Sequence, residues 1–69
     1  MAVARVTEII AASPVSFDDA VKRGFERAVK TLRNITGFHV TEWKARVQDE
    51  QIKEYRVALR VTFLLEDTI

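Results

Sequence analysis

The segment EYRVALRVTFLL, residues 54–65, alternates apolar side chains with polar or mixed ones at a period of two. Successive side chains of a β-strand point to opposite faces of the sheet, so this pattern predicts a two-faced strand. The face that can cover a core carries Tyr55, Val57, Leu59, Val61, Phe63 and Leu65. The other face carries Arg56 and Arg60 beside Ala58 and Leu64. This mixed, cationic face suits a ligand or a contact with another subunit.

Two further strands are expected. Residues 3–11, VARVTEIIA, alternate and are rich in β-branched side chains, until Ser13-Pro14 interrupts the pattern. Residues 38–47, FHVTEWKARV, form the next strand, but its apolar positions change parity between Val40 and Trp43. A strand facing one core can do this only through a bulge, which we expect near Thr41–Glu42. Residues 48–51 form a polar turn before the strand of residues 52–65, and residues 66–69 are expected to fray.

A helix is expected between the first two strands. Ser16 with Asp19 three residues later approximates a capping box at its start. The apolar side chains that follow at helical spacing are Phe17, Ala20, Val21, Phe25, Ala28, Leu32 and Ile35. Gly24 in the interior costs about 1 kcal/mol relative to alanine; it is either a tolerated cost or a point where a strand or another subunit approaches closely. Residues 34–37 are expected to end the helix, with Gly37 available for a positive φ.

These elements predict an α+β fold with the order β-α-β-β in a single domain, residues 1–69. The hairpin makes the third strand antiparallel to the second, and the helical return makes the first two strands parallel to each other. The simplest sheet therefore has the order 1-3-2, fully antiparallel and curled around one helix. The regular pattern of the third strand fits a central position. The far side of the sheet has no second helix to cover it.

Composition limits the function classes. Eleven basic and ten acidic residues give a net charge of +1, which argues against a nucleic-acid-binding arm or a membrane-surface segment. There is no apolar run of membrane-spanning length and no signal-peptide pattern at the start, so a cytoplasmic location is expected. With no cysteine and one histidine, so short a chain cannot use disulfides or thiolate metal sites, and oligomerisation is the remaining way to stabilise it. No catalytic triad, phosphate loop or paired-carboxylate motif indicates an enzyme.

The segments VTEIIAASPVSFDDAV, KTLRNI, GFHV and EYRVALRVTFLLED, together with the chain length, resemble the dodecin family over nearly the whole sequence. The resemblance implies a hollow homododecamer with helices outside and sheets lining the interior. It also implies a non-enzymatic protein that binds or stores a flavin, such as riboflavin or FMN.

Two residues usually carry flavin binding in the family, and both differ here. A tryptophan that stacks on the isoalloxazine ring corresponds to Gly37, and a glutamine that hydrogen-bonds the ring edge corresponds to Arg56. Glycine offers no aromatic face, and arginine donates hydrogen bonds but cannot accept them. The resemblance at Gly37 is to dodecin-like proteins described as not binding flavin, with calcium reported for one branch. Arg56 could instead hold an anion through its bidentate guanidinium.

Other side chains have alternative roles. Trp43 is either a displaced flavin platform or a core or interface residue, and His39 is either a ligand near the pocket mouth or a surface or interface residue. Arg56 and Arg60 either contact a ligand or form intersubunit ion pairs with Glu54 or Glu42. The carboxylates of Asp49, Glu50, Glu66 and Asp67 could bind calcium or simply be solvated. The alternatives to a flavin-type ligand store are therefore a calcium- or anion-binding dodecin and a structural oligomerisation module.

Overall fold

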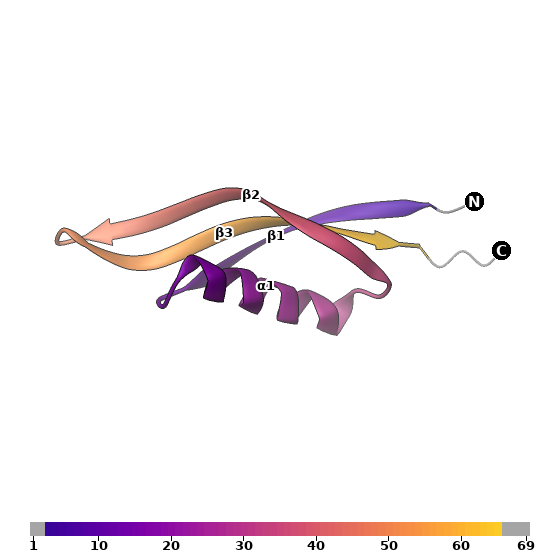
Figure 1. Cartoon of the computed structure of the whole chain (residues 1–69), viewed down its shortest axis with the longest axis horizontal. Helices are drawn as coiled ribbons and strands as arrows, with labels where there is room; N and C mark the ends of the chain where they lie inside the picture. The colour runs from indigo at the N-terminus through magenta and orange to yellow at the C-terminus, as the bar shows by residue number, and fades with distance from the viewer. Residues whose placement is uncertain (1–2, 66–69) are drawn as a thin grey trace.

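The structure, a computed structural model, describes residues 3–65. It contains β1 (Ala4–Ser13), α1 (Phe17–Thr31), β2 (Ile35–Gln48) and β3 (Gln51–Leu64) in that order (Figure 1). Both β1 and β2 pair antiparallel with β3, so the sheet order is β1-β3-β2. The predicted α+β fold, the strand order and the single covering helix are confirmed. The expected frayed tail at residues 66–69 lies outside the described residues.

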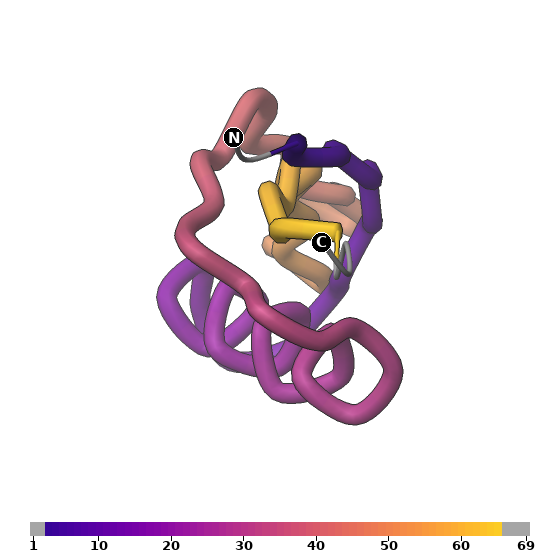
Figure 2. The backbone as a smooth tube through the Cα atoms, turned by 90° about the vertical axis from the view of Figure 1, so that its right-hand side faces the viewer, coloured from indigo at the N-terminus to yellow at the C-terminus, as the bar shows by residue number. Residues whose placement is uncertain are grey.

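The core lies between α1 and the alternate residues of β3. Val57, Leu59 and Val61 of β3 are buried against Ala20 and Ala28 of the helix. A view along the long axis shows α1 on one side, with the strands curling over it (Figure 2). Only small residues of the helix are fully buried, so α1 lies close to the sheet and the core is thin.

Gly24 sits where α1 comes nearest to the sheet. It is buried, and a Cβ built at this position would lie 2.7 Å from Leu59 Cδ1 and 3.0 Å from Ala11 Cβ. These distances are shorter than ordinary van der Waals contact, so a larger residue fits only if the Leu59 side chain or β1 shifts. Of the two interpretations of this glycine, close approach of a strand is the one that the packing supports.

The helix begins as predicted but ends earlier. Ser16 is the N-cap, and its hydroxyl accepts a hydrogen bond from the Asp19 N–H. The last helical residue is Thr31, and Leu32 caps the helix with an extended backbone while its N–H donates to the Ala28 carbonyl. The prediction that residues 34–37 end the helix was wrong, and so was the positive φ at Gly37. Asn34 takes the positive φ of 60°, which asparagine tolerates, and the chain is already in β2 at Ile35.

The predicted bulge lies in β2 at Thr41. Val40 pairs with Leu59 and Glu42 pairs with Ala58, which leaves Thr41 as the extra residue, and its Oγ1 donates to the Ala58 carbonyl at 3.3 Å. Because one residue is inserted, the apolar positions before and after it face the same side. Phe38 and Trp43 therefore both pair with helix-facing residues of β3 despite their opposite parity.

The β2–β3 hairpin extends well beyond the helix. Its loop is Asp49-Glu50, with φ values of 55° and 61°, as in a two-residue type I′ turn. The pairing of β1 with β3 stops at Ser13 and Tyr55, so residues 51–54 of β3 have only β2 beside them.

The described chain is therefore elongated, 55 × 19 × 13 Å, with a radius of gyration of 14.4 Å. A compact domain of this length would have a radius of about 11 Å. Within residues 3–65, the helix α1 does not combine the length and apolar character needed to cross a membrane.

Candidate ligand-binding face of the sheet

The surface of the sheet that faces away from α1, called here the open face, is built from four cross-strand rows. Each row takes one residue from β1, one from β3 and one from β2, and the rows are Val6–Thr62–Gly37, Glu8–Arg60–His39, Ile10–Ala58–Glu42 and Ala12–Arg56–Lys44. No element among residues 3–65 covers these rows, and Ile10 at their centre is 73% exposed. The sheet thus presents a surface on which charged, apolar and small residues follow one another from row to row.

Arg56 lies at the hairpin side of the open face and is already engaged. Its Nε donates to Glu54 Oε1 at 2.9 Å, and Arg46 Nε lies 3.9 Å from the same oxygen. Glu54 was one of the two carboxylates expected to pair with Arg56 between subunits. In the structure it pairs with Arg56 within one subunit. These side chains are exposed, so the pair contributes at most about 1 kcal/mol to stability. Lys44 lies across the strand from Arg56 and pairs with Glu42 at 3.8 Å, so this end of the face holds three cations, Arg56, Lys44 and Arg46, and two carboxylates, Glu54 and Glu42.

Arg60 has a different environment. Its cross-strand neighbours are Glu8 and His39, and with Val6, Glu8 and Thr41 it lines a shallow hollow on the open face. Among residues 3–65, no carboxylate lies within 4.0 Å of its guanidinium. His39 lies beside Arg60 on the side of the sheet that faces away from α1.

The structure brings some of the predicted site residues together and separates others. Gly37, His39 and Arg60 lie in two adjacent rows, whereas Gly37 and Arg56 are separated by six residues along β3. At 3.3–3.4 Å per strand residue, that separation is about 20 Å. A single subunit therefore cannot place both Gly37 and Arg56 against one ring system of the size of a flavin.

Trp43 lies on the opposite side of the sheet from the other four predicted site residues. Its ring packs edge-on against Phe17, with centroids 5.3 Å apart, and Phe17 makes a second edge contact with Tyr55 at 5.0 Å. About half of the Trp43 side chain remains exposed, 53%. Trp43 thus takes part in the packing at the start of α1, and it does not share a surface with Gly37 in one subunit.

The residues around Gly37 do not form the usual flavin contact. A Cβ added at Gly37 would meet no heavy atom within 4 Å, so this part of the open face has space but no aromatic ring to stack on a ligand. Arg56, at the second family position, already donates to Glu54. Neither Gly37 nor Arg56, the two positions that the resemblance predicts for flavin contacts, therefore offers an aromatic ring or a hydrogen-bond acceptor within this subunit.

The described part of the chain contains no preformed cluster of metal-binding side chains. Within residues 3–65, no group of three or more histidine, aspartate or glutamate side chains is placed to share one ion. Asp49 and Glu50 lie at the hairpin turn, and the other two carboxylates considered for calcium, at positions 66 and 67, lie outside the described residues.

Sequence reasoning missed the cross-strand neighbours Lys44 and Glu8. Neither belongs to the alternating segment that defined the open face, and each comes beside an arginine only through the pairing register. They could have been found only from the register of strand pairing, which for Lys44 also requires that Thr41 be counted as a bulge.

Comparison with known proteins agrees with this architecture. The sequence model of the Dodecin family matches residues 3–66. A curated dodecin from Thermus thermophilus is 36% identical over 61 residues, which cover 88% of each chain.

Solved structures agree as well. Dodecin from Streptomyces davaonensis superposes with a TM-score of 0.90 at 36% identity, covering 96% of this chain and 97% of that one. A protein from Mycobacterium tuberculosis, described as a calcium-chelating calcium dodecin with a novel calcium-binding site, gives a TM-score of 0.81 at 29% identity, covering 97% and 96%. The chain belongs to the dodecin family.

Proposed function

We propose that this protein assembles into a hollow homododecamer and binds or stores a small ligand on the open face, without catalysing a reaction. The observation that carries the proposal is the open face itself, a varied sheet surface that no element of the described chain covers. Family membership supports the assembly, and it suggests that the open face lines the interior.

The exposed apolar side chains give independent support for self-association. Within residues 3–65, twelve large apolar side chains remain exposed, including Ile10 at 73%, Val47 at 61% and Trp43 at 53%. For a chain with so thin a core, burial of this surface between copies would add stabilisation of roughly 25 cal/mol per Å². We place the assembly in the cytoplasm, consistent with the absence of cysteine.

For the ligand, we propose that flavin binds weakly or not at all. Gly37 supplies no ring for stacking, and a site that used both family positions would have to combine two subunits because Gly37 and Arg56 lie about 20 Å apart along the strand. The excess of one positive charge at this end, where Arg56, Lys44 and Arg46 face Glu54 and Glu42, favours a second candidate, a small anion such as a carboxylate or phosphate. Calcium, named for the Mycobacterium tuberculosis relative, would need carboxylates from more than one copy or from residues beyond 65.

The experiment that tests this proposal combines mass and ligand binding on the purified protein. Light scattering should give about 95 kDa, which is twelve chains of 7.9 kDa. Riboflavin and FMN are then titrated while flavin absorption and Trp43 fluorescence are recorded. We expect a colourless protein with no saturation at micromolar flavin. A monomer that binds neither flavin nor phosphate would contradict the proposal.

The same sample separates the alternatives. A structural oligomerisation module predicts a smaller, open oligomer with no ligand. A calcium-dependent shell predicts that the melting temperature falls on chelation with EGTA and returns on addition of calcium. An anion site predicts a rise in melting temperature with phosphate, which substitution of both Arg56 and Lys44 by methionine removes.

A further inference from the structure

Two opposite charges face each other on the open face without forming an ion pair. Glu8 of β1 lies directly opposite Arg60 of β3 in the antiparallel register. Side chains placed in this way have Cβ atoms about 5 Å apart, which is close enough for an ion pair. Among residues 3–65, however, no carboxylate oxygen lies within 4.0 Å of the Arg60 guanidinium. Both charges are therefore available to a third group.

The space beside these two side chains is a hollow of about 450 Å³, lined by Val6, Glu8, Thr41 and Arg60. Pockets that hold small molecules begin at about 300 Å³, so the hollow has room for a small metabolite. On the other side of Arg60 the register places His39, an imidazole rather than a second carboxylate. The lining of the hollow thus carries one charge of each sign.

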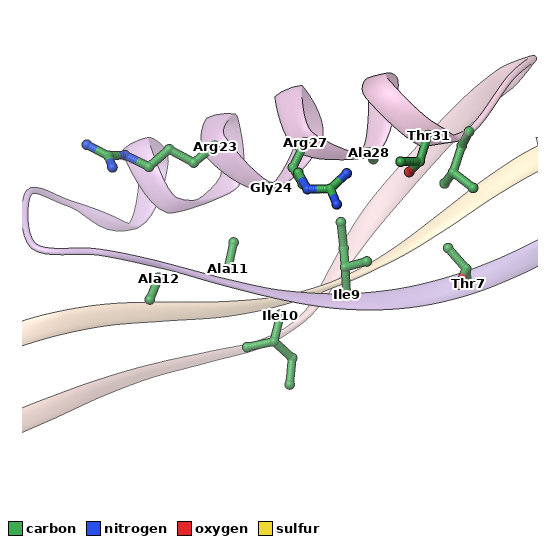
Figure 3. A pocket seen from close by; sticks show the side chains of 11 residues that line it. Thr7, Ile9, Ile10, Ala11, Ala12, Arg23, Gly24, Arg27, Ala28 and Thr31 are labelled. Carbon is green, nitrogen blue, oxygen red and sulfur yellow. The ribbon is translucent and has the colours of Figure 1, made fainter.

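The charged row lies between two apolar positions of β1. Val6 and Ile10 lie two residues before and after Glu8 on the same face, and they are 44% and 73% exposed. Figure 3 shows Ile10 pointing away from α1, whereas its neighbour Ile9 points toward the helix. In the row of Val6, a Cβ added at Gly37 would meet no heavy atom within 4 Å. Apolar surface and free space therefore adjoin the two charges.

A ligand of one sign would leave half of this site unsatisfied. An anion bound to Arg60 would lie beside the Glu8 carboxylate, and a cation bound to Glu8 would lie beside the Arg60 guanidinium, so like charges would repel in either case. A ligand with both charges avoids this repulsion, because its carboxylate accepts hydrogen bonds from Arg60 while its ammonium donates to Glu8. An α-amino acid carries these two groups on one carbon atom.

We propose that this hollow binds a free amino acid with an apolar side chain, its carboxylate on Arg60, its ammonium on Glu8 and its side chain over Val6. The inference rests on the proposed function, because it names a ligand class for the open face. The site is distinct from the end of the face that carries Arg56 and Lys44. In a closed assembly it repeats in every subunit, and a ligand of zero net charge adds no repulsion between the copies.

Equilibrium dialysis of the assembled protein against radiolabelled L-leucine tests the proposal. Isocaproate, which lacks the ammonium group of leucine, and isoamylamine, which lacks its carboxylate, are the matched competitors. We expect leucine to saturate at one molecule per chain and to bind at least about tenfold more tightly than either competitor. This comparison needs no substitution, so it holds even where a variant fails to fold. Equal affinities for leucine and isocaproate would reduce the hollow to a simple anion site and overturn the proposal.

Two substitutions assign the two charges. Arg60→Gln should weaken the binding of both leucine and isocaproate by about tenfold or more. Glu8→Gln should weaken leucine binding by a similar factor but strengthen isocaproate binding, because the repulsion is removed. Lys22→Gln and Glu26→Gln make the same charge changes at exposed positions of α1, away from the open face, and are the matched controls. Light scattering checks that each variant keeps the mass of the wild-type assembly.

The outcomes separate this inference from the proposed function. Leucine affinity that is unchanged or higher in Glu8→Gln would overturn the inference, because the ammonium group would then have no partner. A wild-type dodecamer that binds no leucine at about 10 mM would also overturn it, while leaving the assembly and its other candidate ligands in place. A monomeric wild type would instead remove the proposed function, and this site with it.

Discussion

Gly24 and Leu59 approach so closely that position 24 has no room for a side chain: a Cβ there would lie 2.7 Å from Leu59 Cδ1. Leu59 is fully buried, so its methyl group cannot move away freely. This contact sets the distance between α1 and the sheet.

Replacing Gly24 with alanine should therefore destabilise the protein. Alanine gains about 1 kcal/mol of helix propensity, but overpacking against Leu59 and Ala11 costs about 1–3 kcal/mol. We expect a net loss of about 1 kcal/mol in urea unfolding at fixed protein concentration. Gly37→Ala is the control, because a Cβ at that position meets nothing within 4 Å and its φ is not positive. Equal effects at the two glycines would show that packing at Gly24 does not limit the helix–sheet distance.

A tryptophan at Gly37, the position that the resemblance predicts for a stacking residue, should create flavin binding. Gly37→Trp places an indole on the open face where there is space, and stacking on a flavin contributes about 0.5–1.5 kcal/mol per ring. In a closed assembly two such rings could act on one ligand. We expect at least about tenfold tighter riboflavin binding than wild type, measured by quenching of flavin fluorescence. Gly37→Leu, bulky but not aromatic, should show no gain; if it binds as well as the tryptophan variant, stacking is not what this chain lacks.

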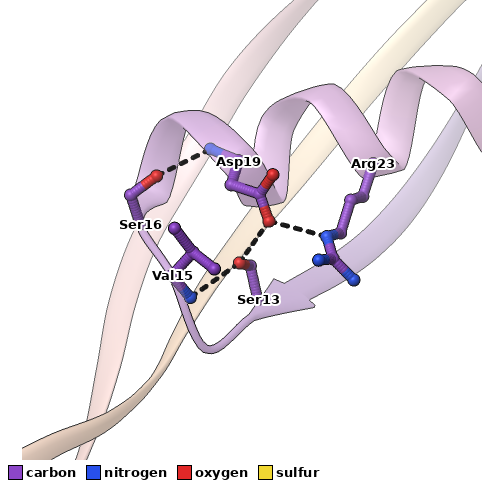
Figure 4. Close-up of polar contacts among 5 residues, drawn as sticks. All are labelled: Ser13, Val15, Ser16, Asp19 and Arg23. Atoms are coloured by element: carbon purple, nitrogen blue, oxygen red, sulfur yellow. Dashed lines mark hydrogen bonds and ion pairs between the residues drawn. The ribbon is translucent and has the colours of Figure 1, made fainter.

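Asp19 should make the stability of the protein depend on pH in the acid range. Ser13 Oγ donates to its carboxylate at 2.5 Å and Arg23 Nε donates at 2.6 Å (Figure 4). The Ser13 hydrogen bond, followed by that from Arg23, lowers the pKa of Asp19 below its ordinary value of 3.8. A pKa lowered in the folded state gives stability that is complete above the ordinary value and is lost as the pH falls through the lower, folded value.

The test compares acid sensitivity between variants. Between about pH 5 and pH 2, the melting temperature of wild type should fall more steeply than that of Asp19→Asn, which cannot be protonated there. Asp18→Asn, which removes the same charge one residue earlier but leaves the Ser13 and Arg23 hydrogen bonds to Asp19 in place, is the matched variant for the comparison. Parallel curves for wild type and Asp19→Asn would exclude this carboxylate as an acid-sensitive group.

Phe17 should contribute more to stability than its position at the first turn of the helix suggests. Its ring makes edge contacts with both Trp43 and Tyr55, each of the kind that adds about 0.5–1.5 kcal/mol. Phe17→Leu should therefore cost about 1–2 kcal/mol of unfolding free energy. Phe25→Leu loses one contact, with Phe38, and should cost less. Urea unfolding should show a larger loss of unfolding free energy for Phe17→Leu than for Phe25→Leu, and the reverse order would contradict the prediction.

Much of the fold could be predicted because local patterns and long-range structure agree. The alternation at residues 54–65 identified the central strand, and the parity change between Val40 and Trp43 located the bulge. The helix end was missed because Leu32 and Ile35 continue the helical spacing, whereas the structure uses Ile35 to pair with Phe63 of β3. Pairing with a distant strand overrides local periodicity, and the sequence near residue 35 does not record it.

The candidate site was less predictable. Parity placed Gly37, His39, Arg56 and Arg60 on one face, but distance along that face depends on register. The row that joins Lys44 to Arg56, and the separation of Gly37 from Arg56, follow from how β2 is shifted at its bulges. Residue types alone could not reveal either.

Because Thr41 is an extra residue in β2, the face on which each later residue of β2 lies depends on the number of residues in the strand and not on the identity of residue 41. Substitutions at this exposed position should be mild, since the Thr41 side chain makes a single 3.3 Å hydrogen bond to Ala58. Deleting it would close the bulge and leave Glu42 opposite Ala58 and Trp43 opposite Val57, whereas adding one more residue beside it would turn every following residue of β2 to the opposite face, with Trp43 on the open face and Lys44 toward Phe17. One added codon thus separates this hairpin, whose Trp43 packs on Phe17 of its own helix, from one whose ring would face away from that helix.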